Sequence, residues 1–236
     1  MKILYVFPHP DDESFGPARA ISAQVRTGHD VHLLTLTRGG ATKERHRLGY
    51  SIEEMGAVRH AEMEEVTKVL GLADLTVLDF PDGGLKELDP REIEAAVASH
   101  IERARPAIIV TYPVHGISGF HDHLVTHAVV KRVFVELRGA GASYLQRLAF
   151  VTLTEEQATA ASGMHRLSGS TAEEIDCVMV AADEDMDAFR SALDCYATYR
   201  EMIERTGVRE SLDRIVAFEI FAESHDPPLD DLCAGL

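Results

Sequence analysis

Residues 2–13, with the sequence KILYVFPHPDDE, decide the fold of this chain. After Lys2 the stretch is a continuous apolar run, which is typical of a strand that is buried on both faces. The run stops at Pro8, and the polar residues 9–13, HPDDE, follow at once. Strands of this kind occur in parallel sheets covered by helices, so we expect an α/β domain with polar residues at the end of its first strand.

Apolar strand-like runs and helical apolar spacing alternate along the first two thirds of the chain. The expected strands are residues 2–7, 31–36, 75–80 and 107–112, and the expected helices are residues 15–27, 52–70, 91–104 and 123–137. Gly28 and Gly71 follow two of these helices, as glycine often does at a helix end. The alternation predicts a single Rossmann-like α/β domain, with a mostly parallel sheet and helices on both faces.

The last third of the chain is less regular. Further strands are expected at residues 148–153, 175–181 and 216–222, and a long helix is expected at residues 184–205. We therefore place one domain at residues 1–223, with extra strands in its C-terminal third. Residues 224–236, which include two prolines and three aspartates, are expected to form a loose tail.

The composition excludes several classes of function. A formal net charge of −16 argues against nucleic acid as a partner, because a phosphate backbone would be repelled. No apolar run approaches the roughly 20 residues that span a bilayer, and the first residues lack the pattern of a secretory signal. Three cysteines without a C-x-x-C pair favour a reducing cytoplasm over a disulfide framework. The expected partner is a small molecule, and the sequence leaves a homo-oligomer open.

Two polar clusters are expected to meet at one edge of the sheet. In a doubly wound sheet the first and fourth strands lie side by side where the strand order reverses, and ligands bind outside their carboxyl ends. The first strand is followed by residues 9–13, and the fourth by a histidine-rich loop and helix start. The latter segment contains His115, His121, Asp122, His123 and His127. This convergence predicts a metal site.

The remaining histidines are isolated from carboxylate pairs in the sequence, so we treat them as structural or surface residues. They are His29, His32, His46, His60, His100, His165 and His225.

Imidazole and carboxylate ligands without thiolate suit a catalytic zinc ion that keeps one open coordination position. Zinc lowers the pKa of a bound water from about 15.7 to about 7. A nearby carboxylate can take the proton of this water and return it to a leaving amine. Asp11 and Asp12 can supply one ligand and one base, but their spacing does not say which is which. The competing interpretations are an acidic N-cap of the first helix and a solvated, histidine-rich turn.

These motifs resemble the LmbE-like (PIG-L) superfamily of zinc-dependent N-acetylglucosaminyl deacetylases. The resemblance rests on PHPDDE after the first strand and on GISGFHDH, residues 116–123, after the fourth. Residues 37–39 and 56–62 also look like the family pattern.

The resemblance implies a role for each matching residue. The zinc ligands would be His9, Asp12 and His123. Asp11 would be the general base, and Asp122 would orient a neighbouring histidine. Arg59 would contact the substrate, and Asp82 lies in a stretch that matches a loop near the pocket.

The chain departs from the family at one position. Where the family usually has H-P-D-H, this chain has Phe120, His121, Asp122 and His123. Phenylalanine therefore stands where the first histidine of the family would stabilise the tetrahedral oxyanion. We expect His121 to supply this charge, with His115 as the alternative.

The predicted function is hydrolysis of an acyl group, acetyl in the first place, from the amide nitrogen of an amino sugar conjugate. Water at the zinc ion would attack, with Asp11 as the base. One alternative is a metal-dependent amidase that acts on a non-sugar conjugate. Another is a ligand-binding α/β module without catalysis, against which the missing G-x-G-x-x-G and G-x-x-x-x-G-K-[ST] motifs count.

Overall fold

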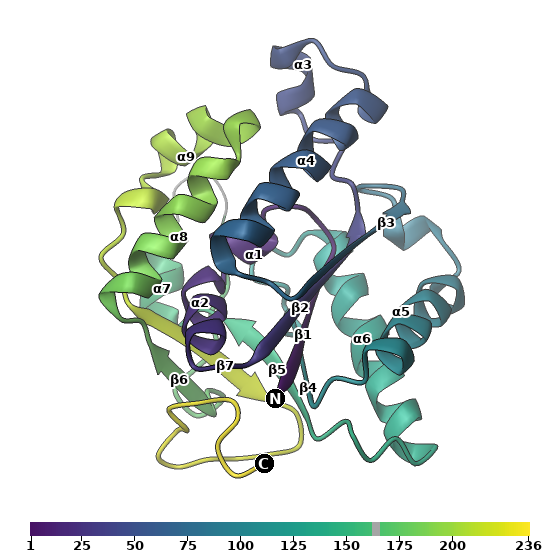
Figure 1. Ribbon diagram of the computed structural model, residues 1–236, viewed down its shortest axis with the longest axis vertical. Helices are drawn as coiled ribbons and strands as arrows, with labels where there is room; N and C mark the ends of the chain where they lie inside the picture. The colour runs from purple at the N-terminus through teal and green to yellow at the C-terminus, as the bar shows by residue number, and fades with distance from the viewer. Residues whose placement is uncertain (162–165) are drawn as a thin grey trace.

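A sheet of seven strands lies at the centre of the computed structural model, which describes residues 1–161 and 166–236 (Figure 1). The strand order is β3-β2-β1-β4-β5-β7-β6. The strands are β1 (Lys2–Phe7), β2 (Asp30–Thr37), β3 (Asp74–Phe80), β4 (Ile108–Thr111), β5 (Arg147–Thr152), β6 (Cys177–Val180) and β7 (Ile215–Ile220). Strands β1 to β5 pair in parallel, whereas β7 is antiparallel to β5 and β6. The predicted fold class is confirmed. His165 lies outside the described residues.

Helices cover both faces of this sheet. They are α1 (Asp12–Phe15), α2 (Ala18–Arg26), α3 (Glu44–Leu48), α4 (Ile52–Leu70), α5 (Pro90–Ala104), α6 (His121–Gly139), α7 (Glu155–Ala160), α8 (Asp183–Cys195) and α9 (Arg200–Thr206). Short 3₁₀ helices are η1 (Leu85–Glu87), η2 (Ala197–Tyr199) and η3 (Val208–Glu210). Among the described residues, no helix is both long and apolar enough to cross a membrane.

The alternating side chains of β1 belong to two separate cores, one on each face of the sheet. Ile3, Tyr5 and Phe7 belong to the core that α2, α4 and α8 cover, whereas Leu4 and Val6 belong to the core under α5 and α6. All five side chains have no exposed surface. Complete burial of such a side chain stabilises the fold by about 1.5–3 kcal/mol. The two helical layers are visible on opposite sides of the sheet in Figure 1.

The strand order reverses between β1 and β4, as the sequence predicts. β1 pairs with β2 on one side and with β4 on the other. The segment after β1 and the loop between β4 and α6 therefore leave the same edge of the sheet. This edge positions the candidate site.

The long helix expected at residues 184–205 is instead broken into α8, η2 and α9. The break occurs at Tyr196, whose backbone ψ of 70° is not helical. The Tyr196 hydroxyl contacts Glu13 and the backbone of Asp11 at the start of α1. Tertiary contacts thus override a continuous helical pattern. The helix expected at residues 15–27 is likewise divided, at Gly16 and Pro17, into α1 and α2.

The C-terminal segment, which the sequence predicts to be loose, makes specific contacts. Leu232 has no exposed surface and belongs to the first core. The buried Arg147 guanidinium donates to the carbonyl oxygens of Leu232 and Ala234. Figure 1 shows the two chain ends close together at the amino ends of the strands. The division into residues 1–223 and 224–236 stays a prediction.

Candidate metal centre and catalytic groups

The structure brings the three predicted metal ligands together. His9 follows β1, Asp12 begins α1, and His123 lies in the first turn of α6. One nitrogen or oxygen atom from each lies within 4.8 Å of the others. The Asp12 carboxylate lies between the two rings, with Oδ2 3.6 Å from His9 Nδ1 and Oδ1 3.5 Å from His123 Nε2. Asp12 is therefore the aspartate that faces both histidines.

Hydrogen bonds fix which nitrogen of each ring faces Asp12. His123 Nδ1 lies 2.9 Å from the carbonyl oxygen of Gly116, and His9 Nε2 lies 3.2 Å from Asp122 Oδ2. Because both partners accept, these two nitrogens carry hydrogen and donate. The lone pairs of His9 Nδ1 and His123 Nε2 are then free to hold a cation beside Asp12.

The surrounding carboxylates favour positive charge at this place. Burial lowers the pKa of His9, but the hydrogen bond to Asp122 and the charges of Asp12 and Asp82 outweigh it and raise this pKa to about 9. A second group of possible ligand atoms, from His9, Asp82 and Asp122, adjoins the first. The same negative charge that favours a proton on His9 would favour a divalent ion. The donor set therefore fits a metal bound through nitrogen and oxygen.

Asp11, the predicted general base, is held in an unusual backbone conformation next to Asp12. Its φ of 86° is left-handed, a conformation that costs a non-glycine residue about 1–3 kcal/mol. Arg59 Nη2 donates to Asp11 Oδ2 at 2.7 Å. Burial raises the pKa of Asp11 to about 7, although the charge of Arg59 opposes this shift. Asp11 belongs to none of the groups of possible ligand atoms found among the described residues.

Arg59, a predicted substrate contact, is 2% exposed and already bound within the protein. Besides Asp11, its guanidinium donates to the carbonyl oxygens of Gly39 at 3.0 Å and Pro10 at 2.5 Å. Gly39 has a φ of 64°, and a Cβ added to it would lie 2.2 Å from Arg59 Nη1. Only glycine fits there. The arginine thus connects the loop after β2 to the turn after β1.

Asp82, the other predicted substrate contact, lies beside His9. Its Oδ1 is 3.3 Å from His9 Nε2, and its Oδ2 accepts the backbone N–H of Ala41 at 2.7 Å. The Asp122 carboxylate accepts hydrogen bonds from the same ring nitrogen and from the backbone N–H groups of Gly83 and Leu85. Asp122 therefore lies where the sequence predicts a residue that orients a histidine.

The structure does not bring the candidate oxyanion residues into the group around Asp12. His121 is exposed at the first position of α6. The His115 ring faces Ser170 Oγ, 3.4 Å from Nε2, and accepts the backbone N–H of Ile117. The Phe120 side chain, 47% exposed, meets the His123 ring edge-on at 5.6 Å. Their roles stay predictions.

Two tyrosines that sequence reasoning missed complete the site. Tyr112 donates to Asp12 Oδ1 at 2.7 Å, and its ring stacks on His123 at 4.1 Å. Tyr196 donates to Glu13 Oε1 at 2.7 Å and accepts the backbone N–H of Asp11 at 2.8 Å. Tyr112 is the last residue of the expected fourth strand, just before the histidine-rich loop, and this position was a usable signal. Tyr196 gave none, because it lies inside a helical pattern.

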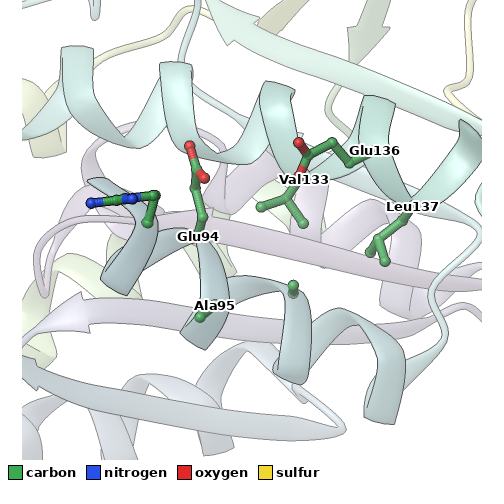
Figure 2. A pocket seen from close by; sticks show the side chains of 7 residues that line it. Glu94, Ala95, Val133, Glu136 and Leu137 are labelled. Atoms are coloured by element: carbon green, nitrogen blue, oxygen red, sulfur yellow. The ribbon is translucent and has the colours of Figure 1, made fainter. Parts of the chain in front are cut away.

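A surface hollow between α5 and α6 lies outside this site (Figure 2). Its charged residues are paired: Arg91 with Asp89, and both Glu94 and Glu136 with Arg132. None of the seven lining residues belongs to a group of possible metal ligands among the described residues. We therefore assign no catalytic role to this hollow.

The family described as PIG-L, GlcNAc-PI de-N-acetylase, matches residues 4–134, which is more than half of the chain. The chain belongs to this family. A relative from Rhodococcus opacus (strain B4), named 1D-myo-inositol 2-acetamido-2-deoxy-alpha-D-glucopyranoside deacetylase, is 27% identical, over 95% of this chain and 90% of the relative. A protein of the same name from Kineococcus radiotolerans is 29% identical over 59% of this chain, and the match spans only 46% of that relative.

Solved structures share the fold at low sequence identity. The zinc-inhibited form of teicoplanin deacetylase Orf2 superposes with a TM-score of 0.68 and 14% identity, over 93% of this chain and 98% of that one. GalB, the 4-carboxy-2-hydroxymuconate hydratase from Pseudomonas putida KT2440, gives a TM-score of 0.67 and 12% identity, over 94% and 96%. Since a deacetylase and a hydratase share this fold, the fold alone does not determine the reaction.

Proposed function

We propose that this protein is a metal-dependent hydrolase that removes an acetyl group from the amide nitrogen of an amino sugar conjugate. The observation that carries the proposal is the convergence of His9, Asp12 and His123 at the β1/β4 edge, with Asp11 adjacent. The relative from Rhodococcus opacus, whose name specifies a deacetylase of a 2-acetamido sugar, supports the substrate class.

We assign zinc to His9, Asp12 and His123, because their nitrogen and oxygen donors suit this ion. When bound, the ion supplies Lewis acidity that polarises the amide carbonyl and acidifies a water molecule. Asp122 keeps the Nδ1 lone pair of His9 toward Asp12 through its contact with Nε2. Tyr112 holds the Asp12 carboxylate and the His123 ring from the opposite side.

Asp11 is the proposed general base. Its carboxylate would accept the proton of the attacking water and pass it to the leaving nitrogen, so that a neutral amine departs. Arg59 fixes the orientation of this carboxylate at 2.7 Å. Because Arg59 is almost fully buried, its proposed contribution to substrate binding acts through Asp11. Asp82, which is partly exposed, is the more direct proposed contact with the substrate.

His121 is the proposed oxyanion-stabilising group. It lies in the same first turn of α6 as His123, two residues away, and its side chain is exposed, where a bound substrate could reach it. His115 is the alternative, and it would first have to leave Ser170 and Ile117.

The proposed partner is a small molecule, and the proposed location is the cytoplasm. Each of the three cysteines, all in the described part of the chain, is a free thiol, which agrees with a reducing compartment. The net charge of −16 disfavours a nucleic acid partner.

An acetate-release assay tests the proposed function. The zinc-loaded chain would be presented with N-acetylglucosamine conjugates and, in parallel, with N-acetylated amines that carry no sugar. We expect acetate release from the sugar conjugates, and loss of this release in Asp11→Asn. Hydrolysis of the non-sugar amides alone would favour the broader amidase function. A metal-loaded chain that releases acetate from neither class would contradict both.

A further inference from the structure

A second cluster of metal-binding side chains lies at the opposite edge of the sheet from the candidate active site. His29 lies in the turn between α2 and β2, and Asp231 and Cys233 lie in the C-terminal segment. One ligand atom from each of the three lies within 4.8 Å of the others, and Cys233 Sγ is 3.9 Å from His29 Nδ1. Figure 1 shows the chain ends meeting at this edge.

The segments that carry the three side chains are held in place by their neighbours. Leu232, between the two C-terminal donors, is completely buried, and Arg147 binds its carbonyl oxygen. Asp231 Oδ1 accepts the backbone N–H of Cys233 at 2.9 Å, which turns this carboxylate toward the thiol. The backbone N–H of His29 donates to the carbonyl oxygen of Gln24 at 3.0 Å. The backbone that carries the three partly exposed side chains is therefore fixed by the fold.

The donors form a set of one nitrogen, one oxygen and one sulfur. Thiolate, imidazole and carboxylate are the three ligand types that zinc takes in proteins. The amino group of Met1 donates to His29 Nδ1 at 3.0 Å, so this nitrogen carries no hydrogen of its own, and an ion bound there would replace the amino group as its partner. Burial and the charge of Asp231 raise the pKa of Cys233 to about 11, so without a cation the sulfur keeps its proton.

We propose that His29, Asp231 and Cys233 bind one thiophilic divalent ion of the zinc class. Binding forms a metal–sulfur bond and releases the thiol proton to solvent. The ion joins segments that are 204 residues apart, so it fastens the C-terminal segment to the turn before β2. Its role is structural, and it is separate from the catalytic ion proposed above.

Cobalt(II) gives a direct test, because a thiolate ligand adds a sulfur-to-cobalt charge-transfer absorption that nitrogen and oxygen ligands do not give. Cobalt chloride alone would be titrated into the untagged, metal-free chain. We expect about two equivalents to bind, with the charge-transfer band belonging to one of them. Cys233→Ala should lose the band and bind about one equivalent fewer. The matched control is Cys195→Ala, which removes a thiol from α8 and should keep the band unchanged.

Two further variants separate this site from the active site. His123→Ala should lose the other equivalent of cobalt but keep the band, so failure at one site does not imitate failure at the other. His29→Gln keeps the thiol and should weaken cobalt binding at the sulfur site at least tenfold. A wild-type chain without a charge-transfer band at saturating cobalt would overturn the proposal. So would a band that persists in Cys233→Ala.

Discussion

The family-matched part of the chain, residues 4–134, and the C-terminal third contribute differently to the candidate site. All the predicted ligands, the predicted base and the predicted substrate contacts come from the first part. The last third contributes no predicted ligand to this site. Its Tyr196 contacts Asp11 and Glu13, which flank the ligand Asp12, and η2 contacts Arg59 through Tyr199. The candidate ligands and catalytic residues thus lie at the carboxyl ends of parallel strands. Residues from a distant part of the sequence pack against them.

The support from the last third is specific. Thr198 donates through its backbone N–H and its hydroxyl to both carboxylate oxygens of Glu62, at 2.8 and 2.7 Å. The Tyr199 ring stacks under the Arg59 guanidinium at 4.5 Å, and its hydroxyl donates to Thr42 at 2.6 Å. These contacts connect η2 to α4 and to the loop after β2. Changes in the first part should therefore affect chemistry, and changes in the last third should affect its alignment.

The largest effect is expected for Asp11→Asn, in the first part. General acid–base catalysis contributes about 10²- to 10⁴-fold, so turnover should decrease by a factor in this range or by a larger one, while the metal stays bound. Acetate release and metal content of the same preparation would be measured. Near-normal turnover would place the base elsewhere.

A somewhat smaller effect is expected for His121→Ala. Loss of one oxyanion-stabilising donor typically costs about 10²- to 10³-fold in turnover, with little change in metal binding. His115→Ala is the matched variant and should be nearly silent. The opposite result, with His115→Ala inactive and His121→Ala active, would transfer the role to His115.

Tyr196→Phe tests the contribution of the last third. It removes one hydroxyl and leaves Glu13 Oε1 and the Asp11 N–H without this partner, which should cost about 1–3 kcal/mol of unfolding free energy. If the hydroxyl also aligns Asp11, turnover should fall roughly tenfold, which corresponds to about 1.4 kcal/mol.

Tyr5→Phe is the matched control for Tyr196→Phe. Tyr5 is also completely buried, and its hydroxyl donates to Gln24 at 2.8 Å, outside the candidate site. The two variants should lose similar stability, but Tyr5→Phe should keep its turnover. Equal turnover in both would reduce Tyr196 to a structural residue.

The smallest effect is expected at Asp185, which joins α8 to α2. Burial raises its pKa, but hydrogen bonds from Arg26, the Ala182 N–H and Ser22 outweigh burial and hold this pKa below its usual range. A folded-state pKa below the unfolded value stabilises the protein above the unfolded pKa, and this contribution disappears as the pH falls through the folded pKa.

Asp185→Asn should therefore lower the unfolding free energy by about 1 kcal/mol at neutral pH. The difference from wild type should shrink as the pH falls below the usual aspartate range. Urea unfolding at several pH values measures both quantities. A difference that does not change with pH would show that the charge of Asp185 contributes nothing.

Much of the fold could be predicted because local patterns and tertiary structure agree in the first part. The bounds of β1 and α4 match the prediction, since buried strands are continuously apolar and Ser51 and Gly71 mark the ends of α4. The meeting of His9, Asp12 and His123 followed from the reversal of strand order between β1 and β4.

The remainder depends on contacts that carry no local signal. The helical spacing runs unbroken through Tyr196, whereas the structure breaks the helix there and places its hydroxyl on Glu13 and the Asp11 N–H. His29 is isolated in the sequence, yet the fold places it beside Cys233. Pairings of this kind depend on how distant segments pack, which periodicity and motif spacing do not encode.

The metal content of the purified chain tests the central claim most directly. Cys233→Ala would serve as the background, so that the cluster around His29 is disabled and only the strand-end cluster can bind. We predict about one zinc ion per chain in this background, and almost none once His9, Asp12 or His123 is also changed to alanine. Full metal occupancy in those three double variants would contradict the account.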